Sequence, residues 1–172
     1  GLKIKIYSRI IMFKNIQQLW VLPLILSIFI SLNFFWSKPL IPGFDSPFYL
    51  TEIRNFSKTF PNPLTYQYLD RYLTIAFPSI ISKLFGFDPV TSYRIAISLV
   101  YVSIAHALFI LMKNLTKRES IAAVLSTSIV ISPLMLTYSS MLFANFTGFL
   151  LLFSFFAIET AENFKYKKIV IC

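Results

Sequence analysis

Four long apolar runs divide this chain, and they restrict its possible folds more than any other feature. The runs lie at 19–36, 92–112, 120–136 and 141–158. A membrane-spanning helix needs roughly 20 mainly apolar residues, and each run comes close to that length. The composition agrees, because only 13% of the residues are charged, against about 25% in ordinary soluble domains. The sequence therefore predicts an all-α, polytopic membrane protein with about four transmembrane helices and a single membrane domain.

A long segment at 37–91 separates the first two runs and predicts a loop on one side of the membrane. Within it, residues 64–85 place polar and apolar side chains at nearly helical spacing. Gly86 then offers a helix stop, and Asp88-Pro89 predicts a turn or helix cap. We interpret 64–85 as an amphipathic helix that lies in the membrane interface rather than as a fifth span.

The basic residues predict the orientation of the chain. They gather at the ends of the apolar runs, which is a membrane-orientation signal and not a nucleic-acid-binding stripe. If 64–85 does not span, one side carries ten basic and three acidic residues and the other carries six basic and four acidic residues. The positive-inside rule then predicts a cytoplasmic N-terminus and an external loop at 37–91. We expect an integral protein of the plasma membrane with no nucleic-acid partner.

The external loop contains an acid in an unusual setting, the stretch Gly43-Phe44-Asp45-Ser46-Pro47-Phe48-Tyr49. A carboxylate beside a membrane span is costly unless it is solvated, paired or used. If a helix begins near Ser46-Pro47, Asp45 would cap its N-terminus. The spacing alone leaves a cap and a catalytic or metal-binding role equally open.

Several short motifs occur in a fixed order around this acid. They are Asp45-Ser46-Pro47-Phe48-Tyr49, Pro63-Leu64, Lys83-Leu84-Phe85-Gly86, Arg94, the basic segment from Lys113 to Arg118, and Ser132-Pro133. This ordered set resembles the GT-C superfamily of integral-membrane glycosyltransferases, particularly the branch of protein O-mannosyltransferases and lipid A aminoarabinose transferases. The resemblance covers about residues 15–160 and corresponds to the N-terminal portion of such an enzyme.

The resemblance implies a reaction and roles for residues. A sugar would pass from a polyprenyl- or dolichyl-phosphate donor in the membrane to an acceptor on the external face. Asp45 matches the catalytic acid of the family motif, which activates the acceptor or binds a divalent cation, and Tyr49, the matching motif tyrosine, is implied to bind substrate. A positioned carboxylate can take a proton from a poor nucleophile. The leaving lipid phosphate needs positive charge, and Arg54, Lys58 and Arg94 are the candidates to supply it.

Other interpretations stay open. Family members often have a second acid where this chain has Ser46; Glu52 is the candidate substitute at a metal site, and a solvated loop acid is the favoured interpretation of that residue. Arg94 has an alternative as an interfacial residue that snorkels. The function itself has two alternatives: a non-catalytic transporter or assembly subunit, and an inactive fragment. Because the chain begins at Gly1 and ends in an apolar stretch after Lys168, we expect an incomplete protein.

Overall fold

Helices make up almost all of the structure. The computed structural model describes residues 19–37, 46–59, 72–141 and 143–161, and these residues contain no strand. The all-α prediction is therefore confirmed for the described residues. In chain order the elements are α2 (Val21–Ser31), the π-helical turn η1 (Leu32–Trp36), α3 (Ser46–Thr59), α4 (Tyr72–Phe85), α5 (Pro89–Thr116), α6 (Glu119–Val130), α7 (Pro133–Met141) and α8 (Phe143–Glu159).

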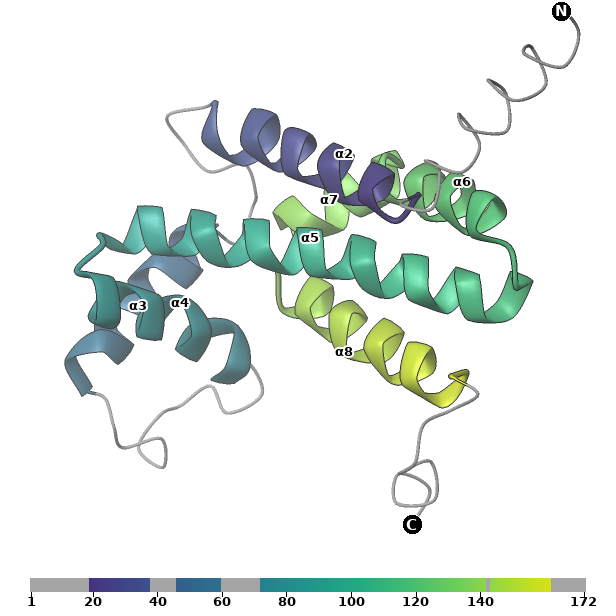
Figure 1. Ribbon diagram of the computed structural model, residues 1–172. Helices are drawn as coiled ribbons and strands as arrows, with labels where there is room; N and C mark the ends of the chain where they lie inside the picture. Colours follow the sequence, from purple (N-terminus) through teal and green to yellow (C-terminus); the bar gives the residue numbers. More distant parts are fainter. Residues whose placement is uncertain (1–18, 38–45, 60–71, 142, 162–172) are drawn as a thin grey trace, which may run out of the picture.

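Helix α5 forms the axis of the fold. It has 28 residues and is therefore about 42 Å long. Helices α2, α6 and α8 pack along it, and α3 and α4 pack at its N-terminal end (Figure 1). Among the described residues, α5 alone is long and apolar enough to cross a membrane, and its most apolar stretch of 18 residues has a mean hydropathy of 2.3. It contains the whole of the predicted span 92–112.

Both ends of α5 are set by local chemistry. At the start, the Asp88 carboxylate accepts hydrogen bonds from the backbone N–H groups of Val90 at 2.9 Å and Thr91 at 3.2 Å. Pro89 follows as the first helical residue, where its missing N–H costs nothing. At the other end, Lys117 adopts a left-handed conformation, with φ of 56°, and its N–H bonds to the carbonyl of Lys113. The predicted cap at Asp88-Pro89 is confirmed.

The other predicted spans coincide with shorter apolar helices. The span 19–36 corresponds to the continuous helical stretch Val21–Trp36, and 141–158 corresponds to α8. The span 120–136 is not one helix, because α6 ends at Val130 and α7 begins at Pro133. Proline lacks an N–H and clashes with the preceding turn, so it breaks the helix. The Ser132 hydroxyl then accepts a hydrogen bond from the N–H of Met135 at 3.3 Å, which caps α7.

The predicted loop at 37–91 contains two helices that pack against each other and against α5. Helix α3 begins at Ser46, as the sequence allowed. Helix α4 corresponds to the second half of the predicted helix 64–85, and residues 64–71 lie outside the described residues. Thr74, Pro78 and Ser79 on α4 are buried, whereas Leu73 and Leu84 are 61% and 72% exposed. Ile75, Ala76 and Ile81 are buried beside them, so the face of α4 toward the protein is mixed, and its outward face carries large apolar side chains.

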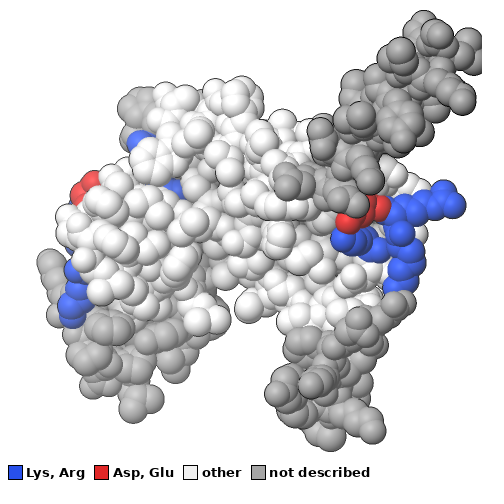
Figure 2. All heavy atoms as spheres, in the orientation of Figure 1, with Lys and Arg blue, Asp and Glu red and all other residues white. Residues whose placement is uncertain are grey.

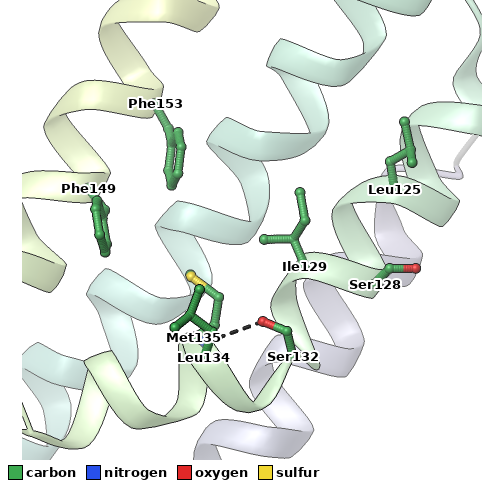
Figure 3. Close-up of a pocket in the computed structure, with 8 residues that line it drawn as sticks. All are labelled: Leu125, Ser128, Ile129, Ser132, Leu134, Met135, Phe149 and Phe153. Atoms are coloured by element: carbon green, nitrogen blue, oxygen red, sulfur yellow. Dashed lines mark hydrogen bonds between the residues drawn. The ribbon is translucent and has the colours of Figure 1, made fainter.

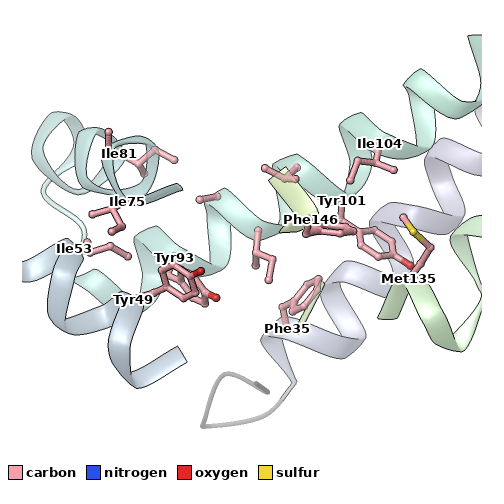
Figure 4. Packing of buried hydrophobic residues seen from close by; sticks show 14 of the residues in the cluster. Phe35, Tyr49, Ile53, Ile75, Ile81, Tyr93, Tyr101, Ile104, Met135 and Phe146 are labelled. Carbon is pink, nitrogen blue, oxygen red and sulfur yellow. The ribbon is translucent and has the colours of Figure 1, made fainter. Parts of the chain in front are cut away.

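A cluster of buried hydrophobic side chains follows α5 from Tyr93 to Leu108 (Figure 4), and a second, smaller cluster of Phe109, Ala122 and Ala123 joins α5 to α6. Near its centre the ring of Tyr101 lies 6.1 Å from that of Phe35 and 5.7 Å from that of Phe146, measured between centroids. These contacts join α5 to η1 and α8. Aromatic pairs at such distances contribute about 1 kcal/mol each beyond simple burial.

The helices around α5 bury small polar residues and expose large apolar ones. On α2, Ser27 and Ser31 are buried, while Ile25 and Phe29 are 60% and 62% exposed. On α6, Ala122, Ala123 and Ser126 are buried, while Ile121, Val124 and Leu125 are exposed. This distribution is the reverse of a water-soluble protein, in which burial of apolar side chains drives folding.

Charged side chains lie at the two ends of the fold. Figure 2 shows an uncharged belt between them on the face in view. The charged residues whose side chains are described are Glu52, Arg54, Lys83, Asp88 and Arg94 at the α3–α4 end and Lys113, Lys117, Arg118, Glu119 and Glu159 at the other. At the second end, Asn114 joins α5 to α8: its side-chain N–H groups donate to the Ala157 carbonyl at 2.9 Å and to the hydroxyl of Thr160, the residue after α8, at 3.2 Å.

Candidate active site at the N-terminal end of α5

The acid on which the catalytic prediction depends lies beside the described part of this region. Asp45 falls outside the described residues, and α3 begins at the next residue, Ser46. The predicted roles of Asp45 as a catalytic acid and as a metal ligand therefore stay predictions. The structure does describe the motif tyrosine, Tyr49, and the start of the second predicted span.

Tyr49 packs against α5 through an aromatic stack. Its ring lies 5.9 Å from that of Tyr93, with an angle of 17° between the ring planes. Both side chains are 1% exposed. Figure 4 shows the two phenol oxygens at the same end of the stack. Residues 44 positions apart in the sequence thus form one contact, and it fixes the first turn of α3 against the first turns of α5.

Arg94 is the residue after Tyr93 and contacts the end of the first apolar helix. Its guanidinium carbon lies 6.0 Å from the centre of the Trp36 ring, which is within the range of a cation–π interaction. The indole N–H of Trp36 donates to the Ser98 hydroxyl at 3.1 Å. Because Ser98 lies one turn after Arg94, Trp36 contacts two successive turns of α5. These contacts hold a positive charge at the α3–α4 end of the fold.

The other two predicted residues lie on α3. Glu52 is half-buried, and Arg54 is exposed. Tyr49 and Arg54 are five residues apart, which places them about 140° apart around the helix axis. The structure therefore brings Tyr49 to Tyr93, beside Arg94, and leaves Arg54 on another side of α3.

A divalent metal site is not assembled by the described residues. No group of three or more His, Cys, Asp or Glu side chains among them lies close enough to hold an ion. Glu52 belongs to no such group among the described residues, and Asp45 lies outside them. The predicted metal ion stays a prediction.

Three residues of this region were not singled out from the sequence as site residues. Tyr93 and Ser98 lie on α5, and Trp36 is the last residue of η1. The predicted topology could have indicated them, because it places the end of the first span and the start of the second on the same side of the membrane. Aromatic residues at those two ends are therefore candidates for contact.

Comparisons of the chain with protein-family models, with curated proteins and with solved structures found no match. The resemblance to GT-C glycosyltransferases rests on the short motifs alone.

Proposed function

We propose that the chain is a polytopic membrane protein and that its α3–α4 end forms the front half of a glycosyltransferase site of the GT-C type. The observation that carries the proposal is the joining of α3, which follows Asp45 directly, to the start of α5 through the Tyr49–Tyr93 stack. The tyrosine of the first loop thereby contacts Tyr93, the residue that precedes Arg94 in the second span. The proposal has two steps, the membrane placement and the chemistry.

Membrane placement is supported by the reversed polarity of α2 and α6. Exposure of Ile25 and Phe29 to water would cost about 25 cal/mol for each Å² of apolar surface, and both are more than half exposed. Lipid removes this cost, while buried Ser27 and Ser31 suit a close approach of helices inside a membrane. In water, the same arrangement would be unfavourable on both faces of α2, because it exposes apolar side chains and buries polar ones.

The spacing of charges along α5 supports the same placement. No charged residue occurs between Arg94 and Lys113, which are 19 residues apart. That interval is about 28 Å of helix, close to the roughly 30 Å of a bilayer core. The side with Lys113 and Arg118 carries a net charge of +7 over the whole sequence, against +2 for the other side. The α3–α4 end is then external.

The chemistry follows from groups near the external membrane surface. A lipid-phosphate sugar donor would bring its phosphate to the end of α5, where Arg94 can bind it with charge-assisted hydrogen bonds. The ring of Trp36 restrains the guanidinium from one side. Asp45 would take the proton of the acceptor hydroxyl or amide as the acceptor attacks the sugar, and Arg94 would stabilise the leaving phosphate. Tyr49 would act by positioning the start of α3.

A second candidate is a non-catalytic membrane module such as an assembly or transporter subunit. Tyr49 favours it, because a ring that is 1% exposed is packed into the protein and does not present itself to a substrate. In this case α3 and α4 would serve as a docking surface on the external side. The two candidates differ in what they require of Asp45.

The test is sugar transfer from a radiolabelled polyprenyl-phosphate donor, in membranes from cells that express the full reading frame encoding this chain. Asp45→Asn should abolish transfer, because the amide cannot accept the proton. Asp88→Asn is the matched control, because asparagine caps a helix as well as aspartate and the residue lies at the same end of the fold. Transfer that survives Asp45→Asn would rule out the catalytic assignment and leave the module.

A further inference from the structure

A pocket of about 400 Å³ lies between α6, α7 and α8 (Figure 3). Its walls include Leu125 and Ile129 of α6, Leu134 of α7, and Phe149 and Phe153 of α8. The break between α6 and α7 creates it, because α7 turns away at Pro133 and covers one end of the gap.

The two serines in the wall of the pocket do not make it polar. The Ser128 hydroxyl donates to the Val124 carbonyl at 2.9 Å, within its own helix. The Ser132 hydroxyl accepts from the N–H of Met135 at the start of α7. Both hydroxyls thus have backbone partners, and the surface that remains for an occupant is apolar.

The depth of the pocket can be measured along two helices. Leu125 and Ile129 lie six and ten residues after Glu119, and Phe153 and Phe149 lie six and ten residues before Glu159. Both helices therefore place the pocket about 9 to 15 Å from their charged ends. In the proposed membrane placement this is the hydrocarbon region of the cytoplasmic leaflet.

The size of the pocket favours a hydrocarbon chain over a further helix. Two turns of α-helix occupy a cylinder about 10 Å wide and 11 Å long, or about 850 Å³, whereas the pocket holds about 400 Å³. A single hydrocarbon chain, which is thinner than a helix, is the occupant that this volume favours.

A basic cluster lies in line with the pocket on α6. Arg118, the N-cap residue of α6, precedes Leu125 by seven residues, or two turns, so that both lie on one face of the helix about 10 Å apart. Exposed Ile121 lies between them. Lys117 adjoins Arg118, and Lys113 forms an ion pair with Glu119 at the same end of the fold. The start of α6 also carries the positive end of the helix dipole.

We propose that the basic cluster and the pocket together bind one anionic glycerophospholipid of the cytoplasmic leaflet. Its phosphate would lie at Lys117 and Arg118, and one acyl chain would lie in the α6–α7–α8 pocket. The proposal rests on the membrane placement and not on sugar transfer. Basic residues at this depth attract anionic headgroups, and the exposed apolar surface of Ile121 and Leu125 lies along the path of the chain.

The test uses the full chain purified in detergent and two photoreactive lipids, phosphatidylglycerol and phosphatidylcholine, each with a diazirine in the acyl chain. Crosslinked peptides are mapped by mass spectrometry. Phosphatidylglycerol should label 125–135 and 149–153 and exceed phosphatidylcholine there. Arg118→Gln should lower its labelling about fivefold, which corresponds to one surface cation.

Two tryptophan variants separate the pocket from the general lipid surface. Leu125→Trp fills the pocket and should remove most of the label. Val124→Trp is the matched control, because Val124 is 63% exposed and lies outside the pocket wall. Thermal melting checks that both variants are folded. Equal labelling by the two lipids, or labelling that is unchanged by Leu125→Trp, would overturn the proposal. Sugar transfer plays no part in the readout, so this result and that of Asp45→Asn are independent.

Discussion

The phenol of Tyr101 on α5 donates a hydrogen bond to the backbone carbonyl of Val130 at 2.5 Å. Val130 is the last residue of α6, and its carbonyl is one of those that a helix end leaves without a partner in the helix. The contact joins the centre of the longest helix to the break at Ile131-Ser132. The hydrogen bond thereby gives a partner to the Val130 carbonyl, which the break would otherwise leave unpaired inside an apolar core.

Removal of this hydroxyl should destabilise the fold modestly. Tyr101→Phe keeps the ring contacts and loses one buried hydrogen bond, for which we expect a cost of about 1 kcal/mol. Tyr101→Leu also loses the rings of Phe35 and Phe146 as partners, at about 1 kcal/mol for each pair. Thermal denaturation in detergent measures both. Equal losses for Phe and Leu would contradict a role for the ring contacts.

The cap at Asp88 should make the stability of α5 depend on pH. A hydrogen bond from the Thr91 side chain, together with the backbone N–H groups of Thr91 and Val90, lowers the pKa of Asp88 below its ordinary value. Because the folded pKa is the lower one, the stabilisation is present at neutral pH and disappears as the pH falls below the unfolded value of about 3.9 and through the folded pKa.

Two substitutions isolate this cap. Asp88→Ala should cost about 1 kcal/mol at pH 7, whereas Asp88→Asn should cost only a few tenths of that through the loss of charge at the helix start. The difference between the native chain and Asp88→Asn should shrink between pH 6 and pH 3, as followed by thermal melting. A difference that is constant with pH would show that the Asp88 charge does not contribute.

The stack between Tyr49 and Tyr93 should appear as an energetic coupling. Tyr49→Ala and Tyr93→Ala each remove a buried ring. Once one ring is gone, the contact between the rings is already lost, so the second substitution destabilises the protein by less. We expect a coupling energy of about 1 kcal/mol in a double-mutant cycle. Additive losses would mean that the two rings pack independently, and α3 would then have no specific attachment to the start of α5 through this pair.

Exposed apolar residues on α2 should behave as lipid-facing residues. Phe29→Lys should hinder membrane insertion by about 2.5 to 3.5 kcal/mol because it places a charge in the centre of a span. Ser27→Ala, on the opposite and buried face, should be tolerated. The measurement is the fraction of chain that resists alkaline extraction from membranes. In a water-soluble protein the lysine would be harmless, so full retention of Phe29→Lys would count against the placement.

Local sequence signals predicted much of the fold. Asp88-Pro89 predicted the start of α5, and the apolar run 92–112 predicted its centre, because caps and long apolar stretches act over a few residues. Pro133 signalled an interruption for the same reason. The helix nevertheless ends at Val130, because a proline ring also interferes with the turn before it.

Contacts between distant residues could not be predicted in this way. The Tyr49–Tyr93 stack and the Trp36–Arg94 contact each join residues more than 40 positions apart, and their formation depends on how whole helices pack. The buried face of α2 could not be predicted either, because apolar residues occur all around the helix and its serines are too few to mark one face. On α4, Thr74 and Ser79 are buried together with Ile75 and Ile81 where the helix packs against α3 and α5, and the sequence pattern did not predict this mixed face.

The central claim is that the α3–α4 end and the basic end lie on opposite sides of a membrane. It is tested by labelling of single cysteines with an impermeant maleimide in whole cells, with Cys172 replaced by serine. Lys83→Cys should react in intact cells, Lys117→Cys only after permeabilisation, and Ile25→Cys in neither state. Reaction of Lys83→Cys and Lys117→Cys under the same condition would contradict the account.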